Sequence, residues 1–282
     1  MKRITIYDVA KEADVSLATV SRVINNRGYI SEKTKKRVHE VMDELGYQPN
    51  EIARSLTKQK SNTIGVIVPH ISHPYFAKLI SNLENEAAKK DYKIILCNSK
   101  EKAEKEKQYL DMCKSNRVAG IIICSGNVES NKINTGGIPV VLLEKNFEEG
   151  KLGIQCDNYQ GGKLATEHLI ECGCKKILHL SGVIDEEMPA DNREKAFIDV
   201  CSKNEIEYFI KKYDIDTYNQ MNYYDYIKAA LNEIEGVDGI FASSDLIAAQ
   251  VIQVCNEIKI RIPEDIKLVG FDDVDISQLT TP

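Results

Sequence analysis

Residues 5–25 read TIYDVAKEADVSLATVSRVIN, and this stretch decides how the N-terminal part of the chain folds. Thr5 is followed three residues later by Asp8, which is the spacing of a capping box at the start of a helix. Apolar residues then recur at helical spacing, and a short turn leads to Ser16, a side chain suited to cap a second helix. The stretch therefore predicts two short helices joined by a three-residue turn.

A third helix is predicted directly after these two. Ser31 is in position to cap its start and Gly46 to end it. Two short helices across a tight turn, braced by a third, are the helix-turn-helix arrangement, although a generic three-helix bundle has the same pattern. The apolar stripe expected to face the core of this small all-α domain comprises Val38, Val41, Met42 and Leu45.

The second predicted helix, residues 17–25, favours DNA over the generic bundle. Val20 and Val23 would face inward, which leaves a small, apolar and cationic surface outside. Leu17 and Ala18 can touch thymine methyl groups, and Arg22 can donate two hydrogen bonds to guanine. Hydroxyl groups able to bond phosphates are those of Ser16, Thr19 and Ser21.

Charge is distributed unevenly along the chain. The formal net charge is −6, but residues 1–62 carry +4 and the remainder carries −10. A small basic module joined to a large acidic one is typical of a DNA-binding protein with a separate sensor, although a solvated basic face would look the same.

From residue 62 the pattern changes to alternating strands and helices. Such alternation predicts parallel sheets with helices on both faces. The length of residues 62–282 suits two doubly wound α/β lobes. The predicted strands are 63–68, 93–97, 120–124, 140–143, 177–180, 239–242 and 267–270, with helices at 74–90, 159–171 and 246–257 among them. Ligands of such folds bind beyond the carboxyl ends of strands, where polar residues occur at 70–76, 98, 157, 243–245 and 272.

Several classes of protein are disfavoured. The 282 residues, 43% hydrophobic and 28% charged, indicate a globular chain of two or more domains. We find no apolar run long enough to span a bilayer and no signal peptide, so we expect a cytoplasmic protein. The phosphate-loop, dinucleotide-binding and serine-hydrolase motifs are missing, which argues against an enzyme.

We expect neither a metal nor a cofactor. Most of the eight cysteines lie in apolar runs, which suits structural cysteine in a reducing compartment. Cys172 and Cys174 are the one close pair. His70 and His73 are the best-placed histidines for a metal, but no matching carboxylate or cysteine motif accompanies them.

Residues 4–25, together with 46–56 (GYQPNEIARSL), closely resemble the opening of lactose/galactose-repressor (LacI/GalR) family transcription factors. The resemblance extends over nearly the whole chain, through 62–69 (NTIGVIVP), the 157–173 segment, 239–245 (GIFASSD), 262–266 (IPEDI) and 269–273 (VGFDD). It implies a bacterial regulator, with a repressor the favoured interpretation, that binds pseudo-palindromic operator DNA as a homodimer. It further implies that a small metabolite, a sugar or a derivative, binds between two lobes similar to periplasmic sugar-binding proteins.

The resemblance also implies a division of the chain. Residues 1–48 would form the helix-turn-helix domain, 49–61 a hinge that becomes helical on the operator, and 62–282 the effector-binding and dimerisation domain. Leu56 would wedge into the minor groove; a linker leucine packing on its own domain is the alternative. The implied DNA-contacting residues are Thr5, Tyr7, Ser16, Leu17, Ala18, Thr19, Ser21, Arg22, Asn25, Tyr47, Asn50, Ala53 and Leu56.

For the effector, the resemblance implies that Tyr75 and Phe76 stack on the ligand. Its polar groups would be bonded by Glu144, Arg193, Ser244, Asp245 and Asp272. In the alternative, Arg193 and an acid form a salt bridge between the lobes.

The chain departs from the family pattern in several places. Glu144-Lys145 stands where Asp-Arg is more frequent, Ser244 where Asn is common, and an aromatic is missing near 214–215. The family also continues for a few tens of residues past residue 282, so we expect either an incomplete effector domain or a sheet that is completed differently.

Three other functions remain open from the sequence. A catabolite-control regulator would use a phosphorylated carrier protein as corepressor. A solute-binding protein would capture sugar without binding DNA, and an enzyme would turn a bound ligand over.

Overall fold

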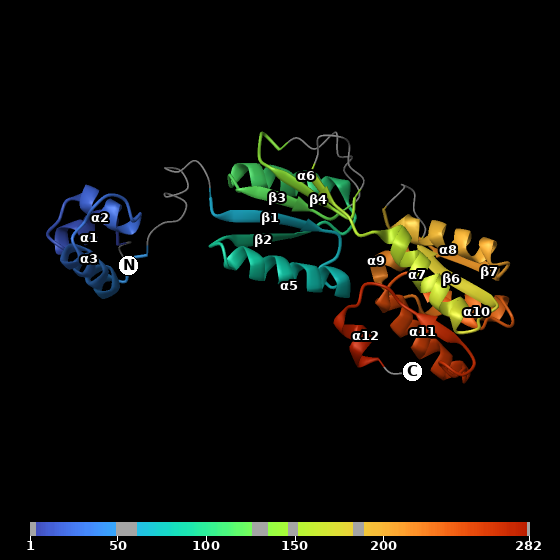
Figure 1. The fold of residues 1–282 in the computed structure, drawn as a ribbon. Coiled ribbons are helices and arrows are strands. Elements are labelled where there is room, and N and C mark those ends of the chain that lie inside the picture. The colour runs from blue at the N-terminus through green and yellow to red at the C-terminus, as the bar shows by residue number, and fades with distance from the viewer. Residues whose placement is uncertain (1–3, 49–60, 126–134, 146–151, 183–188, 281–282) are drawn as a thin grey trace. The chain divides into compact units, whose positions relative to one another are not determined.

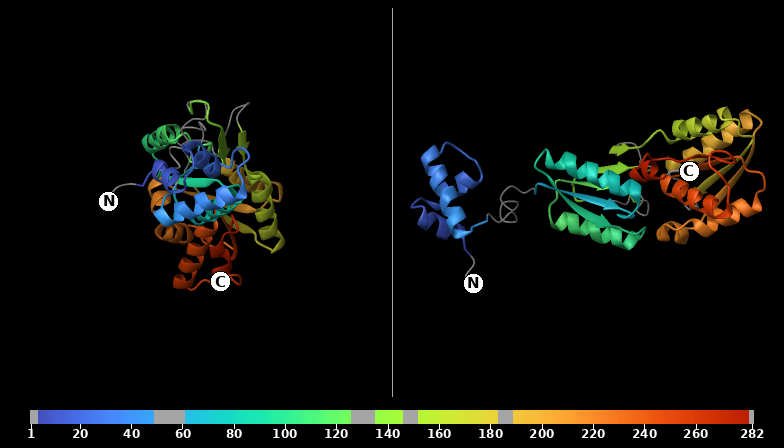
Figure 2. Two further views of the ribbon diagram at one scale, coloured as in Figure 1. Left: turned by 90° about the vertical axis from the view of Figure 1, so that its left-hand side faces the viewer. Right: turned by 90° about the horizontal axis from the view of Figure 1, so that it is seen from below.

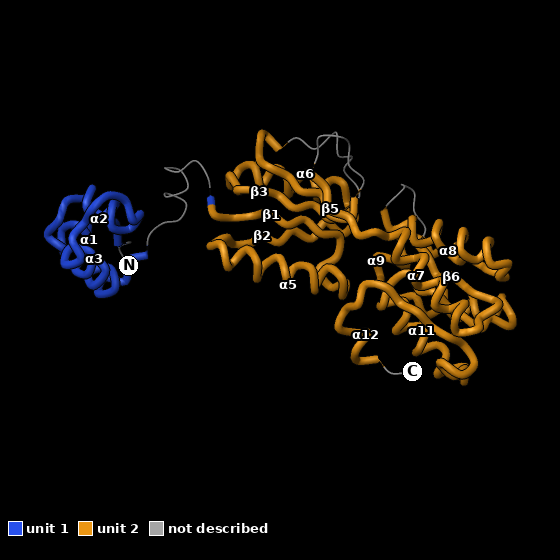
Figure 3. Tube along the Cα trace, in the orientation of Figure 1, with its two compact units in different colours: residues 1–61 blue, residues 62–282 orange. Residues whose placement is uncertain are grey.

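The computed structural model describes residues 4–48, 61–125, 135–145, 152–182 and 189–280. The chain divides into two compact units, residues 1–61 and residues 62–282 (Figure 3). Each unit has its own hydrophobic core. None of the described helices is long and apolar enough to cross a membrane.

Within residues 4–48, the described part of the first unit, the chain forms a bundle of three helices, as the sequence predicts (Figure 1). Local hydrogen bonds define their ends: the Asp8 carboxylate accepts from the Thr5 backbone N–H at 2.8 Å, and Ser16 Oγ accepts from the Thr19 N–H at 3.1 Å. Gly46 ends the third helix in a left-handed conformation, φ +63°, which a glycine adopts without strain. The helices are α1 (Ile6–Glu12), α2 (Leu17–Ile24) and α3 (Glu32–Leu45).

Small β-branched side chains form the core of this unit. Val9, Val20, Val38 and Val41 are completely buried, and Val23 nearly so. Because α2 is only eight residues long, its stability depends on this packing. The core therefore fixes which face of α2 remains exposed.

The second unit begins with a five-stranded parallel sheet, the first lobe, in the order β2-β1-β3-β4-β5. Helices α5 (Pro74–Ala88) and α6 (Ala103–Ser115) lie on opposite faces of this sheet (Figures 1 and 2). The α5 face packs around Val66, Val68 and Phe76, and the α6 face around Ile67 and other residues. The strands are β1 (Thr63–Val68), β2 (Lys93–Asn98), β3 (Gly120–Ile123), β4 (Val140–Leu143) and β5 (Leu152–Ile154).

The second lobe is a four-stranded parallel sheet in the order β7-β6-β8-β9. Helices α7 and α8 cover one face and α10 and α11 the other (Figure 2). Its strands are β6 (Lys176–Gly182), β7 (Glu207–Tyr213), β8 (Gly239–Ala242) and β9 (Lys267–Val269). Its helices are α7 (Asn158–Glu171), α8 (Asn192–Lys203), α9 (Ile215–Gln220), α10 (Tyr224–Glu233), α11 (Asp245–Ile258) and α12 (Asp275–Leu279), with a 3₁₀ turn at Pro189–Asp191.

The predicted fold class is confirmed, but β5 and β7 were not predicted from the sequence. β5 is only three residues long, which is too short for a periodic signal. β7 is an edge strand that contains Lys211 and Lys212, so it lacks the continuous apolar run of a central parallel strand.

Gly162 sets how closely α7 and α8 pack. A Cβ at this position would lie 2.6 Å from the Arg193 carbonyl oxygen, so only glycine allows this approach of the two backbones. The contact brings Arg193, near the start of α8, close to the first turn of α7.

Candidate functional site

The outer face of α2 is open to solvent. Leu17 is 37% exposed, and Ala18 and Arg22 are also exposed, while Val20 and Val23 face the core. Tyr7, on α1, is 69% exposed. The residues predicted to read bases therefore lie outside the core and share one element.

Two of the three predicted phosphate-contacting hydroxyls, those of Ser16 and Thr19, also lie in the cap at the start of α2. Ser16 Oγ caps α2 and lies 2.8 Å from Thr19 Oγ1. The Asn25 side-chain amide donates to the Ser21 carbonyl oxygen at 2.8 Å, which closes the other end of α2. Thr5 is the N-cap residue of α1, and Tyr47 packs partly buried against the domain core. Asn50, Ala53 and Leu56 lie outside the described residues.

The second unit contains a cavity of about 510 Å³ at the carboxyl ends of second-lobe strands. Four of the seven predicted effector residues line it: Tyr75 from α5 of the first lobe, with Arg193, Asp245 and Asp272 from the second. The remaining lining residues are Cys156, Gly270, Phe271, Asp273 and Ser277.

Arg193 is held in a defined orientation in this cavity. Its Nε donates to Asn158 Oδ1 and its Nη1 to the Ser243 carbonyl oxygen, both at 2.7 Å. The guanidinium lies 3.6 Å from the centroid of the Phe271 ring, and Nη1 is 3.7 Å from Asp272 Oδ1. This geometry presents a fixed cation to a ligand.

Asp272 is an unusual carboxylate. Burial raises its pKa to about 7, against the opposing effect of Arg193, and Asp245 and Glu144 raise it further. Its backbone has φ +97°, a conformation that L-residues rarely adopt. Asp272 lies in the loop between β9 and α12, residues 270–274. Asp245 holds this loop: its N–H donates to the Phe271 carbonyl oxygen at 2.8 Å, and its Oδ2 accepts from the Val274 N–H at 2.8 Å.

Three predicted effector residues do not line the cavity. Phe76 is 9% exposed and packs in the first-lobe core, because consecutive residues of a helix point in different directions. Ser244 caps α11 by accepting from the Ile247 N–H at 3.3 Å. Both Glu144 oxygens accept hydrogen bonds, from the Cys156 N–H at 2.6 Å and from Asn158 Nδ2 at 3.0 Å.

In the alternative interpretation, Arg193 and an acid form a salt bridge between the lobes. Arg193 does pair with Asp272, but both residues belong to the second lobe, so this pair does not link the lobes. The lobes are linked elsewhere. His70 Nε2 lies 3.0 Å from Asn219 Oδ1, and Lys78 Nζ donates to the Asp273 carbonyl oxygen at 2.5 Å.

Sequence reasoning missed Tyr218 at this junction. Its ring lies 5.2 Å from that of His70 and 6.4 Å from that of His73. Burial lowers the pKa of His73 to about 4, so its ring is neutral at pH 7. The expectation that an aromatic is missing near residues 214–215 is wrong, because Tyr213 directly precedes this stretch and Tyr218 lies one helical turn further along α9.

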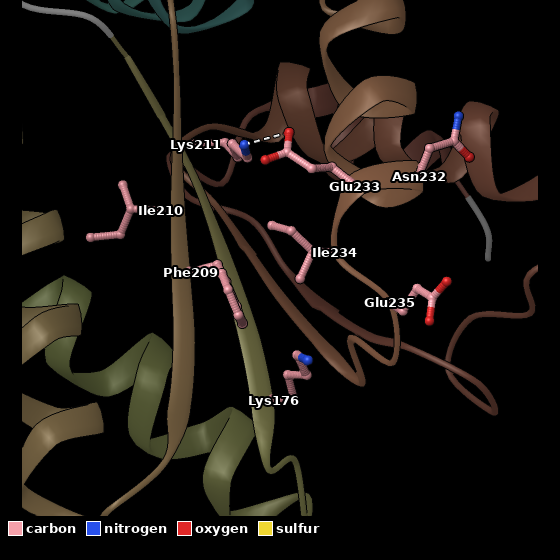
Figure 4. Close-up of a pocket in the computed structure, with 8 residues that line it drawn as sticks. All are labelled: Lys176, Phe209, Ile210, Lys211, Asn232, Glu233, Ile234 and Glu235. Atoms are coloured by element: carbon pink, nitrogen blue, oxygen red, sulfur yellow. Dashed lines mark ion pairs between the residues drawn. The ribbon is translucent and has the colours of Figure 1, made fainter.

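A second hollow of about 430 Å³ lies at the β7 edge of the second sheet (Figure 4). Lys211 and Glu233 form an ion pair across it at 2.6 Å, and Lys176 Nζ lies 5.1 Å from the Phe209 ring centroid. No predicted site residue lines this hollow. Among the described residues no group of three or more His, Cys, Asp or Glu side chains is arranged to hold a metal ion.

Two family models match the chain. Residues 5–50 match "Bacterial regulatory proteins, lacI family". Residues 61–281 match "Periplasmic binding proteins and sugar binding domain of LacI family". The two matches together leave only short stretches of the chain unassigned.

Individual relatives are similar over nearly the full chain. The ribose operon repressor of Halalkalibacterium halodurans is 37% identical, over 99% of this chain and 83% of that protein. The sucrose operon repressor of Pediococcus pentosaceus is 36% identical, over 98% of this chain and 86% of that protein.

A solved structure extends the comparison to the second unit. It is the periplasmic binding protein/LacI transcriptional regulator from Alkaliphilus metalliredigens QYMF in complex with D-xylulofuranose. It is 35% identical with a TM-score of 0.69, over 78% of this chain and 81% of that one. The chain belongs to the lacI family of bacterial regulatory proteins and is a DNA-binding transcriptional regulator.

Proposed function

We propose that this regulator is a repressor that binds a pseudo-palindromic operator as a homodimer and that a sugar or sugar derivative controls this binding. The observation that carries the proposal is the exposed face of α2, where Leu17, Ala18 and Arg22 project from a helix anchored by buried valines. A rigid recognition helix with apolar and guanidinium groups suits direct readout in the major groove.

The DNA contacts divide by chemistry. We assign base contacts to Leu17, Ala18 and Arg22, and insertion into the minor groove to Leu56 of the hinge, residues 49–61. Backbone-phosphate and flanking contacts are assigned to Thr5, Tyr7, Ser16, Thr19, Ser21, Asn25, Tyr47, Asn50 and Ala53.

The cavity lined by Tyr75, Arg193 and Asp272, called the cleft from here on, is proposed to bind the effector without transforming it. The protein is proposed to act in the bacterial cytoplasm. Tyr75 supplies an aromatic face, and Arg193, Asp245 and Asp272 supply a donor and acceptors for hydroxyl groups. Relatives are named for ribose and sucrose operons, and a similar structure holds D-xylulofuranose. These names support a carbohydrate as the ligand class, and their diversity leaves the individual sugar to experiment.

The decisive experiment selects bound sequences from a random pool of duplex DNA, with and without ribose, sucrose and xylulose. We expect a two-fold symmetric consensus, binding that weakens steeply with salt, and a change in binding with at least one sugar. Failure to select any sequence would reject the proposal. A response to a phosphorylated carrier protein, with none to any sugar, would favour catabolite control.

A variant tests the hinge assignment. Leu56→Ala should weaken binding to the selected operator far more than binding to random DNA, because the wedge forms only on a specific site. Leu164→Ala, at an exposed leucine on α7, is the matched control and should change neither. Equal losses on both DNAs would reject the wedge.

A further inference from the structure

Asn158 occupies the point where the chain passes from the first lobe into the second. It is the first residue of α7 and only 2% exposed, although its side chain is polar. A buried side-chain amide is costly unless its donors and acceptor are satisfied. Here Nδ2 donates to Glu144 Oε2 at 3.0 Å and to the Cys156 carbonyl oxygen at 3.3 Å, while Oδ1 accepts from Arg193 Nε at 2.7 Å.

The first-lobe partner of this amide is fixed. Glu144 directly follows β4, its backbone N–H donates to the Ile154 carbonyl oxygen at 2.9 Å, and its Oε1 accepts from the Cys156 N–H at 2.6 Å. Its carboxylate therefore cannot move without disturbing the chain that crosses between the lobes.

The second-lobe partner lies in the cleft. Arg193 extends from α8 over the Phe271 ring toward Asp272, and its Nε is directed at Asn158. Among the described side chains, Asn158 alone bonds both Glu144 and Arg193. The three residues form a continuous path from the end of a first-lobe strand to the cation of the cavity.

An amide is the group that this path requires. A carboxylate needs a donor and a guanidinium needs an acceptor, and the asparagine side chain offers both on atoms bound to the same carbon. Aspartate at position 158 would place two carboxylates in contact, and leucine would remove the bonds that Asn158 makes to Glu144 Oε2 and Arg193 Nε.

We infer that Asn158 is a positioning residue that orients Arg193 for the effector and couples that orientation to the first lobe through Glu144. This inference rests on the proposed function of the cleft. A ligand that engages Arg193 would bind best with the lobes in one relative arrangement, and a ligand shifts an equilibrium only through such a difference in affinity.

Exchanging the amide and the carboxylate between positions 158 and 144 tests this inference. In Asn158→Asp, we expect the affinity for whichever of ribose, sucrose or xylulose binds the native protein to fall at least tenfold, with operator affinity in the absence of sugar within twofold of native. Adding Glu144→Gln should restore sugar affinity to within about fivefold, because the new side-chain amide can donate to a carboxylate at position 158 that still accepts from Arg193. Asn116→Asp, at the exposed C-cap of α6, is the matched control and should bind sugar as the native protein does.

Two outcomes would overturn the inference. One is native-like sugar affinity and sugar-dependent operator release in Asn158→Asp. The other is a double variant no better than the single one. If no sugar binds the native protein, the proposed effector fails separately. The inference is then tested by the same swap in urea unfolding without ligand, where additive effects of the two substitutions would overturn it.

Discussion

The helix-turn-helix unit and the cleft of the second unit differ in the sequence distance between their functional residues. Leu17, Ala18 and Arg22 lie within one turn and a half of a single helix. Tyr75, Arg193 and Asp272 come from three elements spread over almost 200 residues. A recognition surface can therefore follow from local periodicity, whereas the cleft exists only after two sheets have formed.

The two regions also differ in how their polar groups are employed. Hydrogen bonds on α2 are local, between residues three or four apart, and leave Arg22 exposed. In the cleft, Arg193 and Asp245 bond partners far along the chain and are mostly buried. We therefore expect substitutions in the cleft to change stability as well as binding.

Among the substitutions predicted here, Asp272→Asn should change the free energy of unfolding the most. The pKa of Asp272 is raised from 3.8 to about 7, so its favourable contribution is complete below pH 3.8 and is lost as the pH rises through 7. At about 1.36 kcal/mol per pKa unit, this costs the native second lobe up to about 4 kcal/mol above pH 7. The variant should be more stable at pH 8 and should bind sugar poorly.

Hydrogen exchange read by mass spectrometry follows each unit separately in the intact chain. Protection should increase in the second lobe of Asp272→Asn and stay unchanged in α1–α3. A variant that is less protected at pH 8, or that keeps the native pH dependence between 4 and 7, would contradict this prediction.

His179 should make the stability of the folded chain depend on pH in the opposite direction from Asp272, because its contribution is lost as the pH falls. It is fully buried between Phe197 and Phe241, with Nδ1 2.9 Å from the Phe241 carbonyl oxygen, and burial lowers its pKa to about 4. Only the unfolded chain is protonated between pH 6.5 and 4, so the free energy of unfolding should fall by about 3 kcal/mol over that range.

Urea unfolding from pH 7 to 4, compared between the native chain and His179→Phe, measures this contribution. The phenylalanine variant should lose that part of the acid sensitivity. An unchanged slope would mean that His179 is not the group responsible.

Arg22→Ala should cost about 1–3 kcal/mol of operator binding and relax one guanine position in each half-site. Lys36→Ala, at an exposed position of α3, is the control and should leave base preference intact. Operator titrations with single-base variants measure both. Native-like affinity and preference in Arg22→Ala would remove α2 from the role of recognition helix.

The smallest effect concerns cysteine reactivity. Cys156 lines the cavity, and burial together with Glu144 raises its thiol pKa to about 11, so a maleimide should label it slowly at pH 7.5. Bound sugar should slow labelling several-fold further. Cys172, exposed at the end of α7, is the internal control and should label at the same rate with or without sugar. Equal slowing at both sites would exclude local protection.

The sequence was sufficient where a signal is local and periodic. Caps at Thr5, Ser16 and Ser31 and the glycine at 46 predicted the first three helices, and apolar runs predicted β1, β4 and β8 with their observed ends. The same reasoning failed for β7, which has no continuous apolar run, and for Tyr218, which is placed by α9.

What the sequence alone determined is the helix-turn-helix, the parallel α/β class and the residue types of a polar cleft, because these depend on contacts within a few residues. Only the tertiary structure decided that Phe76 packs in the core, that Ser244 is a cap, and that Asn158 joins Glu144 to Arg193. Those roles depend on which side chains the two sheets bring within hydrogen-bonding distance, and no short-range pattern records such distances.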